Sequence, residues 1–147
     1  MPRQLARSGH FEFGPGKRAA HLGDDESAAA IVDDWNAGRL AEGWARYWTA
    51  IYRHVLDFLG ADSGHREAVF VLGYERLCAD PEAALDALLG HLDLDPAPFA
   101  AIRVDFAGRI SPPDYYRPEF SDSELERIRE LTAPVAARLA AAEVADR

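Results

Sequence analysis

Cysteine and lysine are almost absent from this sequence of 147 residues, each occurring once. The single cysteine, Cys78, excludes an internal disulfide and a cysteine metal cluster. One unpaired thiol fits a reducing, cytoplasmic setting, which is the localisation we expect. The sequence has no apolar run of about 18 residues, so we expect no membrane span. Its first residues also lack the apolar stretch of a secretory signal.

Positive charge is also scarce, with 16 basic residues against 25 acidic ones and a net charge of −9. Nonspecific binding to nucleic acid needs a basic surface, so we expect no nucleic-acid partner. A polyanionic ligand would need positive charge that is focused locally. Because Lys17 is the only lysine, arginine would have to supply that charge.

Apolar residues are plentiful at 48% of the chain, enough for a hydrophobic core in one domain of this length. Residues 1–25 are rich in glycine and show no apolar periodicity, so we expect them to be irregular. Residues 26–147 alternate periodic segments with turn signals and are expected to form the core. We therefore predict one domain over residues 1–147.

Two helices are predicted in the first half of the core. Ser27–Asn36 places its apolar residues on one face, and Leu40–Leu59 repeats them at steps of three and four. The stripe of the longer helix comprises Leu40, Trp44, Tyr47, Trp48, Ile51, Val55, Phe58 and Leu59. Gly38 and Gly60 follow the two stripes, where glycine favours a helix end.

Three further helices are predicted downstream. Asp80-Pro81 is a strong helix start, because aspartate caps the end and proline fits the first turn. A short helix is expected over Pro98–Ile102. Ser121 and Glu124 have the spacing of a capping box at the start of the last helix. Pro134 should kink or split that helix, since proline has no N–H to donate.

The segment Ala68–Tyr74 is short, β-branched and almost continuously apolar. This pattern predicts a strand buried on both faces, of the kind found in parallel sheets. Each unpaired backbone group of a lone buried strand costs about 1–3 kcal/mol. Val104–Ile110 offers only a weaker second strand. We therefore expect an incomplete α/β domain, mostly helical, whose missing strands belong to lost neighbouring segments or to another copy or partner.

A family resemblance lies in the same region. Val69–Leu85 reads VFVLGYERLCADPEAAL and resembles the sulfotransferase superfamily, in which a buried strand is followed by Tyr-Glu-Asp-Leu, Asp-Pro and a leucine-bearing helix. Trp44, Tyr47 and Trp48 upstream and Leu89–Leu94 downstream are similar to the family as well. The resemblance covers roughly residues 40–140.

The resemblance implies a P-loop-like α/β fold and transfer of a sulfuryl group from 3′-phosphoadenylyl sulfate (PAPS) to a hydroxyl or amine acceptor. Three features depart from the family. Arg76 stands where an acid is usual, and the N-terminal strand–loop–helix that cradles the donor has no good match. The family's later arginine and serine, which hold the donor's 3′-phosphate, also have no identifiable match. We therefore expect a truncated or degenerate family member, possessing no catalytic residue that the sequence identifies.

The resemblance also implies a site for the donor's nucleotide, in a C-terminal loop that includes Arg109, Ser111, Tyr115 and Tyr116. Arg109 would meet a phosphate and a tyrosine would stack on adenine. The alternative is a proline-rich connector whose tyrosines pack on the core. Tyr74-Glu75 would lie at the carboxyl end of the strand, where α/β sheets bind ligands.

No metal site is expected, because no two of the five histidines have ligand spacing. Two other functions stay open beside sulfuryl transfer. One is a non-enzymatic helical module that dimerises or docks through the edge of its strand. The other is a small ligand-binding α/β domain without transfer activity. The sequence does not define the acceptor.

Overall fold

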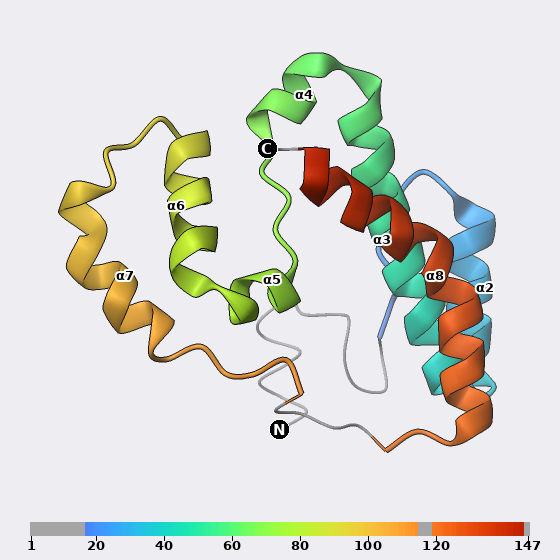
Figure 1. Ribbon diagram of the computed structural model, residues 1–147. Helices are drawn as coiled ribbons and strands as arrows, with labels where there is room; N and C mark the ends of the chain where they lie inside the picture. The colour runs from blue at the N-terminus through green and yellow to red at the C-terminus, as the bar shows by residue number, and fades with distance from the viewer. Residues whose placement is uncertain (1–16, 115–118, 146–147) are drawn as a thin grey trace. The chain divides into compact units, whose positions relative to one another are not determined.

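The computed structural model describes residues 17–114 and 119–145, and every regular element within these ranges is a helix (Figure 1). The helices are α2 (Asp25–Asn36), α3 (Leu40–Ala61), α4 (Ser63–Ala68), α5 (Tyr74–Ala79), α6 (Pro81–His91), the 3₁₀ turn η1 (Ala97–Phe99), α7 (Ala100–Ala107) and α8 (Asp122–Ala145). None of these helices combines the length and the hydropathy of a membrane span.

The chain divides into two compact units. The first unit comprises Met1–Phe58 and Phe120–Ala137, and the second comprises Leu59–Glu119 and Arg138–Arg147. Of the described helices, the first unit therefore contains α2, most of α3 and the first part of α8, while the second contains α4 to α7.

The prediction of an α/β fold with a buried strand over Ala68–Tyr74 is wrong. Ala68 ends α4 and Tyr74 begins α5, and no strand occurs in the described ranges. The backbone is nevertheless extended at both ends of the segment between them, with φ −117° and ψ 120° at Val69 and φ −75° and ψ 142° at Gly73. β-branched residues favour this local conformation, but a strand also needs a paired neighbour. At Gly73 the N–H is instead bonded to the carboxylate of Glu143 in the same unit.

The suggestion of a second strand over Val104–Ile110 is also wrong, because α7 includes most of this segment. The short helix predicted over Pro98–Ile102 is confirmed as η1 and the start of α7. Arg103 of α7 is mostly buried and forms an ion pair with Asp86 of α6. The contact between these two helices therefore includes an ion pair, which the spacing of apolar residues in the sequence does not predict.

The predicted helix starts are confirmed. In α2, the side chain of Asp24 accepts a hydrogen bond from the backbone N–H of Ser27 at 3.0 Å. In α6, Asp80 accepts one from the N–H of Ala83 at 3.1 Å. The capping box of α8 is present, since the Ser121 N–H donates to the Glu124 carboxylate at 2.8 Å and the Glu124 N–H donates to the Ser121 hydroxyl at 3.3 Å.

The predicted helix ends are confirmed only in part. Gly38 follows α2 with a φ of 78°, a left-handed conformation that suits glycine after a helix end. Gly60, by contrast, lies inside α3, which continues to Ala61. Pro134 does not split α8. The carbonyl of Leu131, three residues before this proline, accepts a hydrogen bond from the Thr49 hydroxyl of α3 at 2.9 Å.

The core of the first unit is aromatic. Ile31, Trp35 and Tyr47 are buried together. The ring centre of Trp35 lies 4.9 Å from that of Trp44 and 5.7 Å from that of Tyr47. The predicted stripe of Leu40–Leu59 is therefore confirmed as core in part: Tyr47 and Leu59 are buried, whereas Leu40 and Phe58 are exposed and Trp48 is half-buried. This core positions the α2 and α3 side chains described next.

Candidate functional site

The structure describes two of the four residues predicted to bind the donor. Tyr115 and Tyr116 lie outside the described residues. Arg109 and Ser111 follow the end of α7 in the second unit. The Arg109 guanidinium is 71% exposed and pairs with Asp105, one helical turn earlier, at 2.9 Å. Since that partner is itself more than half exposed, an incoming phosphate can compete with it for the guanidinium.

Ser111 is attached to α5 through its backbone carbonyl. This carbonyl accepts a hydrogen bond from the Tyr74 hydroxyl at 2.8 Å and one from the Cys78 thiol at 3.2 Å. Tyr74 was predicted at the end of a strand but is the first residue of α5. The structure therefore brings together two candidate segments that lie 37 residues apart in the sequence.

The described histidines do not form a metal site. His21 pairs with Asp25, and the ring of His91 lies 5.3 Å from that of Phe70, measured between their centres. In the described part of the chain, no group of three or more histidine, cysteine or acidic side chains is placed to hold a metal ion. His10 lies outside that part.

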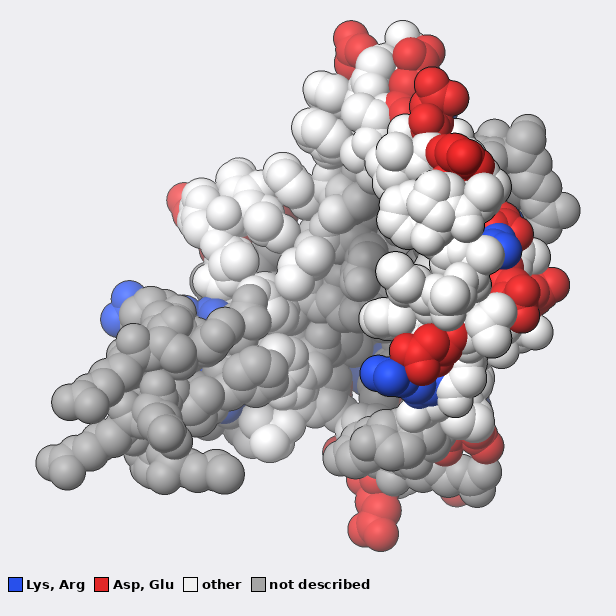
Figure 2. All heavy atoms as spheres, turned by 90° about the vertical axis from the view of Figure 1, so that its left-hand side faces the viewer, with Lys and Arg blue, Asp and Glu red and all other residues white. Residues whose placement is uncertain are grey.

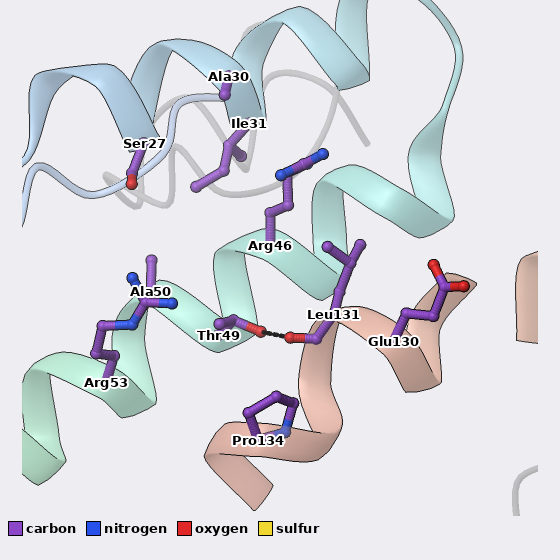
Figure 3. Close-up of a pocket in the computed structure, with 10 residues that line it drawn as sticks. All are labelled: Ser27, Ala30, Ile31, Arg46, Thr49, Ala50, Arg53, Glu130, Leu131 and Pro134. Atoms are coloured by element: carbon purple, nitrogen blue, oxygen red, sulfur yellow. Dashed lines mark hydrogen bonds between the residues drawn. The ribbon is translucent and has the colours of Figure 1, made fainter. Parts of the chain in front are cut away.

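A cavity in the first unit was not predicted from the sequence. It has a volume of about 360 Å³ and lies among α2, α3 and α8 (Figure 3). Its lining residues are Ser27, Ala30 and Ile31 from α2, Arg46, Thr49, Ala50 and Arg53 from α3, and Glu130, Leu131 and Pro134 from α8. Two of them are arginines, seven residues apart on one face of α3.

This pair of arginines is notable because the molecule as a whole is acidic. The face seen in Figure 2 carries more acidic than basic groups, in keeping with the net charge of −9. At the cavity, Arg46 is paired with Asp34, which leaves Arg53 as the arginine that can meet an anionic ligand. Periodicity places both arginines off the apolar stripe of their helix, but only the packing of three helices creates the cavity beside them.

Next to the cavity, Asp34 is buried and binds two arginines. Its carboxylate accepts hydrogen bonds from Arg39 at 2.6 Å and from Arg46 at 2.8 Å. Burial acts to raise the pKa of Asp34, but the hydrogen bonds and charges of the two arginines outweigh it and lower the pKa below its ordinary value. Asp34 therefore stays ionised and holds Arg46 at the edge of the cavity.

An apolar groove of about 620 Å³ lies elsewhere in the first unit, between α3 and α8. It is lined by Leu40, Ala41, Trp44, Ala45, Trp48, Phe120, Ile128, Thr132 and Ala136. Its one hydroxyl, on Thr132, donates to the carbonyl of Ile128 at 2.8 Å. This groove therefore presents almost no polar group to a ligand.

Comparison with protein-family models, with curated proteins and with solved structures found no match for this chain. The resemblance to sulfotransferases therefore rests on the residues quoted from the sequence and stays a prediction. The prediction of a single, incomplete domain also stays a prediction beside the two compact units.

Proposed function

We propose that this chain is a sulfotransferase-family polypeptide that takes part in sulfuryl transfer from PAPS to a hydroxyl or amine. Its role is to bind the nucleotide part of the donor through the loop that begins at Arg109. The observation that carries the proposal is the attachment of Ser111 to Tyr74 and Cys78 of α5. The candidate nucleotide loop thereby lies against the helix that contains the family's Tyr-Glu signature.

The order of local elements also supports this proposal. The extended residues after Val69 are followed by α5 with Tyr74 and Glu75, and then by Asp80 and the leucine-bearing α6. Apart from the strand, which the structure replaces with extended backbone, this order matches the one that the resemblance implies. We place this activity in the reducing cytoplasm, where the thiol of Cys78 stays free.

Arg109 has the chemistry that a phosphate contact needs. Its planar guanidinium donates paired hydrogen bonds and keeps its charge at any physiological pH. Because it is largely exposed, binding a phosphate costs little desolvation of the arginine itself. Arg129 offers a matched comparison, since it is also 71% exposed and pairs with an acid, Glu126, on its own helix.

The substitution Arg109→Gln is expected to weaken binding of 3′-phosphoadenosine 5′-phosphate by about tenfold, the loss of one charge-assisted phosphate contact. Isothermal titration calorimetry measures this directly. The control Arg129→Gln removes the same charge from an equally exposed position and should leave affinity within about twofold. Equal weakening by both variants, or no heat with the unaltered chain at millimolar nucleotide, would contradict the proposal.

A second candidate is the non-enzymatic helical module that binds a partner or a second copy. It is favoured by apolar exposure in the second unit, where Ile102, Val104 and Phe106 of α7 are each more than half exposed. Ile102 and Phe106 lie one turn apart on one face of this helix, and exposed apolar patches are typical of interaction surfaces.

Sedimentation velocity tests this second candidate. The chain is expected to sediment as a dimer or larger species, and the double substitution of Ile102→Ser and Phe106→Ser should shift it to monomer without loss of helical circular dichroism. Since both side chains are exposed, these changes remove little from the core of the folded chain. A monomer at all concentrations would argue against self-association.

A further inference from the structure

The cavity of Figure 3 combines apolar and polar walls with the guanidinium of Arg53. Its apolar surface comes mainly from Ala30, Ala50, Leu131 and Pro134, while Ile31, which is almost fully buried, contributes only a small part. The volume of about 360 Å³ lies within the range of small-molecule sites, about 300–1,000 Å³. A ligand with a short hydrocarbon portion is therefore suited to these walls.

The charged and hydroxyl side chains of the cavity are already engaged, with one exception. Arg46 donates to Asp34, and Glu130 accepts from Arg127 at 2.7 Å. The hydroxyls of Ser27 and Thr49 donate to Asp24 and to a backbone carbonyl. Among the residues that the structure describes, no carboxylate forms an ion pair with Arg53.

Arg53 also lines a second, smaller cavity of about 140 Å³. The two cavities share Ser27, Ile31, Ala50 and Arg53, and the smaller one is also lined by Asp24 and Asp57. These acids, together with Glu130, line the two cavities beside Arg53. They repel a dianion such as phosphate about twice as strongly as a monoanion, and a single negative charge is matched by one guanidinium.

We propose that this cavity binds a small monocarboxylic acid with a short hydrocarbon tail. The carboxylate pairs with the Arg53 guanidinium, which presents two parallel donors of the right spacing. The tail lies against Ile31, Leu131 and Pro134. The site belongs to the first unit and is separate from the loop at Arg109, so its ligand is independent of the sulfuryl donor.

Hexanoate titrated into the full chain, followed by calorimetry, tests this site. The substitution Arg53→Gln is expected to weaken binding by at least about tenfold, because a hydrogen bond to a charged group is worth about 1.5–3 kcal/mol. Arg129→Gln, which removes an arginine outside the cavity, should leave affinity unchanged. No binding of hexanoate at millimolar concentration, or equal loss in both variants, would overturn the site.

Two further probes and one further variant test the ligand class. Hexylamine, with the same tail and the opposite charge, should not bind, and inorganic phosphate should bind more weakly than hexanoate. The substitution Ala30→Leu adds a side chain to the wall and should abolish hexanoate binding although Arg53 is intact. Phosphate binding as tight as hexanoate, or full affinity in Ala30→Leu, would show that the apolar walls take no part and overturn the assignment.

Discussion

Replacing Asp34 with asparagine is expected to lower the free energy of unfolding by about 2–3 kcal/mol at pH 7. The buried carboxylate binds Arg39 and Arg46 through three hydrogen bonds of 2.6–2.9 Å. Asparagine keeps the size of the side chain but removes its charge, so both arginines lose their ionic partner. The side chains of Arg39 and Arg46 are 50% and 37% exposed, so water can solvate their charges in part after the carboxylate is lost. The loss of stability is therefore smaller than for a fully buried ion pair.

The effect of this substitution should depend on pH in a defined direction. Because the arginines lower the pKa of Asp34 in the folded chain, the carboxylate contributes stability that is fully present above its unfolded-state pKa. That contribution is lost as pH falls through the lower, folded-state pKa. The difference between the unaltered chain and Asp34→Asn should therefore be constant near neutrality and shrink below about pH 4.

Urea unfolding followed by tryptophan fluorescence measures both effects. All three tryptophans of the chain, Trp35, Trp44 and Trp48, belong to the first unit, so their emission reports on the unit that contains Asp34. The control is Asp33→Asn, an exposed neighbour on the same helix, which should change stability by less than about 0.5 kcal/mol. A difference that grows on acidification would contradict the assigned role of Asp34.

The sequence predicts the longer helices of this protein well because their signals are local, whereas the six-residue helices α4 and α5 were not predicted. The stripe from Leu40 to Leu59 needs only the spacing of apolar residues, and the caps at Asp80 and Ser121 need only one or two side chains. Each of these signals is complete within a few turns of backbone. That is why helix starts are confirmed to within a residue or two, and why α3 ends at Ala61, two residues beyond the predicted Leu59.

The strand and the cavity could not be predicted in the same way, because both depend on residues far apart in the chain. Val69 adopts the extended backbone that its sequence favours, but pairing is decided by a neighbour, and no described segment pairs with it as a strand. Similarly, Arg53 is an exposed arginine whose place beside a cavity depends on the packing of α2 and α8 against α3. The hydrogen bond between Tyr74 and Ser111 is equally non-local, so the sequence does not predict it although both residues are candidates on sequence grounds.

Gly43 gives the clearest case in which packing should reverse a local preference. In the interior of a helix, alanine is favoured over glycine by about 1 kcal/mol, so sequence alone predicts that Gly43→Ala stabilises α3. The structure predicts the opposite. A methyl group at this position would lie 2.6 Å from Nε1 of Trp35, closer still to its Cδ1 atom, and 3.3 Å from Cβ of Asp34.

Gly43→Ala is therefore expected to lower the free energy of unfolding by about 1–3 kcal/mol, the usual cost of overpacking a core. The indole of Trp35 is buried against Trp44 and Tyr47 of α3. It can therefore move away from a new methyl group only by giving up these two ring contacts. The same urea titration measures this loss, and the tryptophan emission should shift in the folded state as the ring is displaced.

Gly60→Ala is the control on the same helix, where a methyl group would meet no atom within 4 Å. Because Gly60 belongs to the second unit, its unfolding is followed by helical circular dichroism rather than by tryptophan emission. Its stability should stay unchanged or rise by up to about 1 kcal/mol. If Gly43→Ala stabilised the chain as much as Gly60→Ala, the close approach of α2 to α3 at Trp35 would be wrong. The cavity beside Arg53, which depends on the same approach of these two helices, would then lose its walls as well.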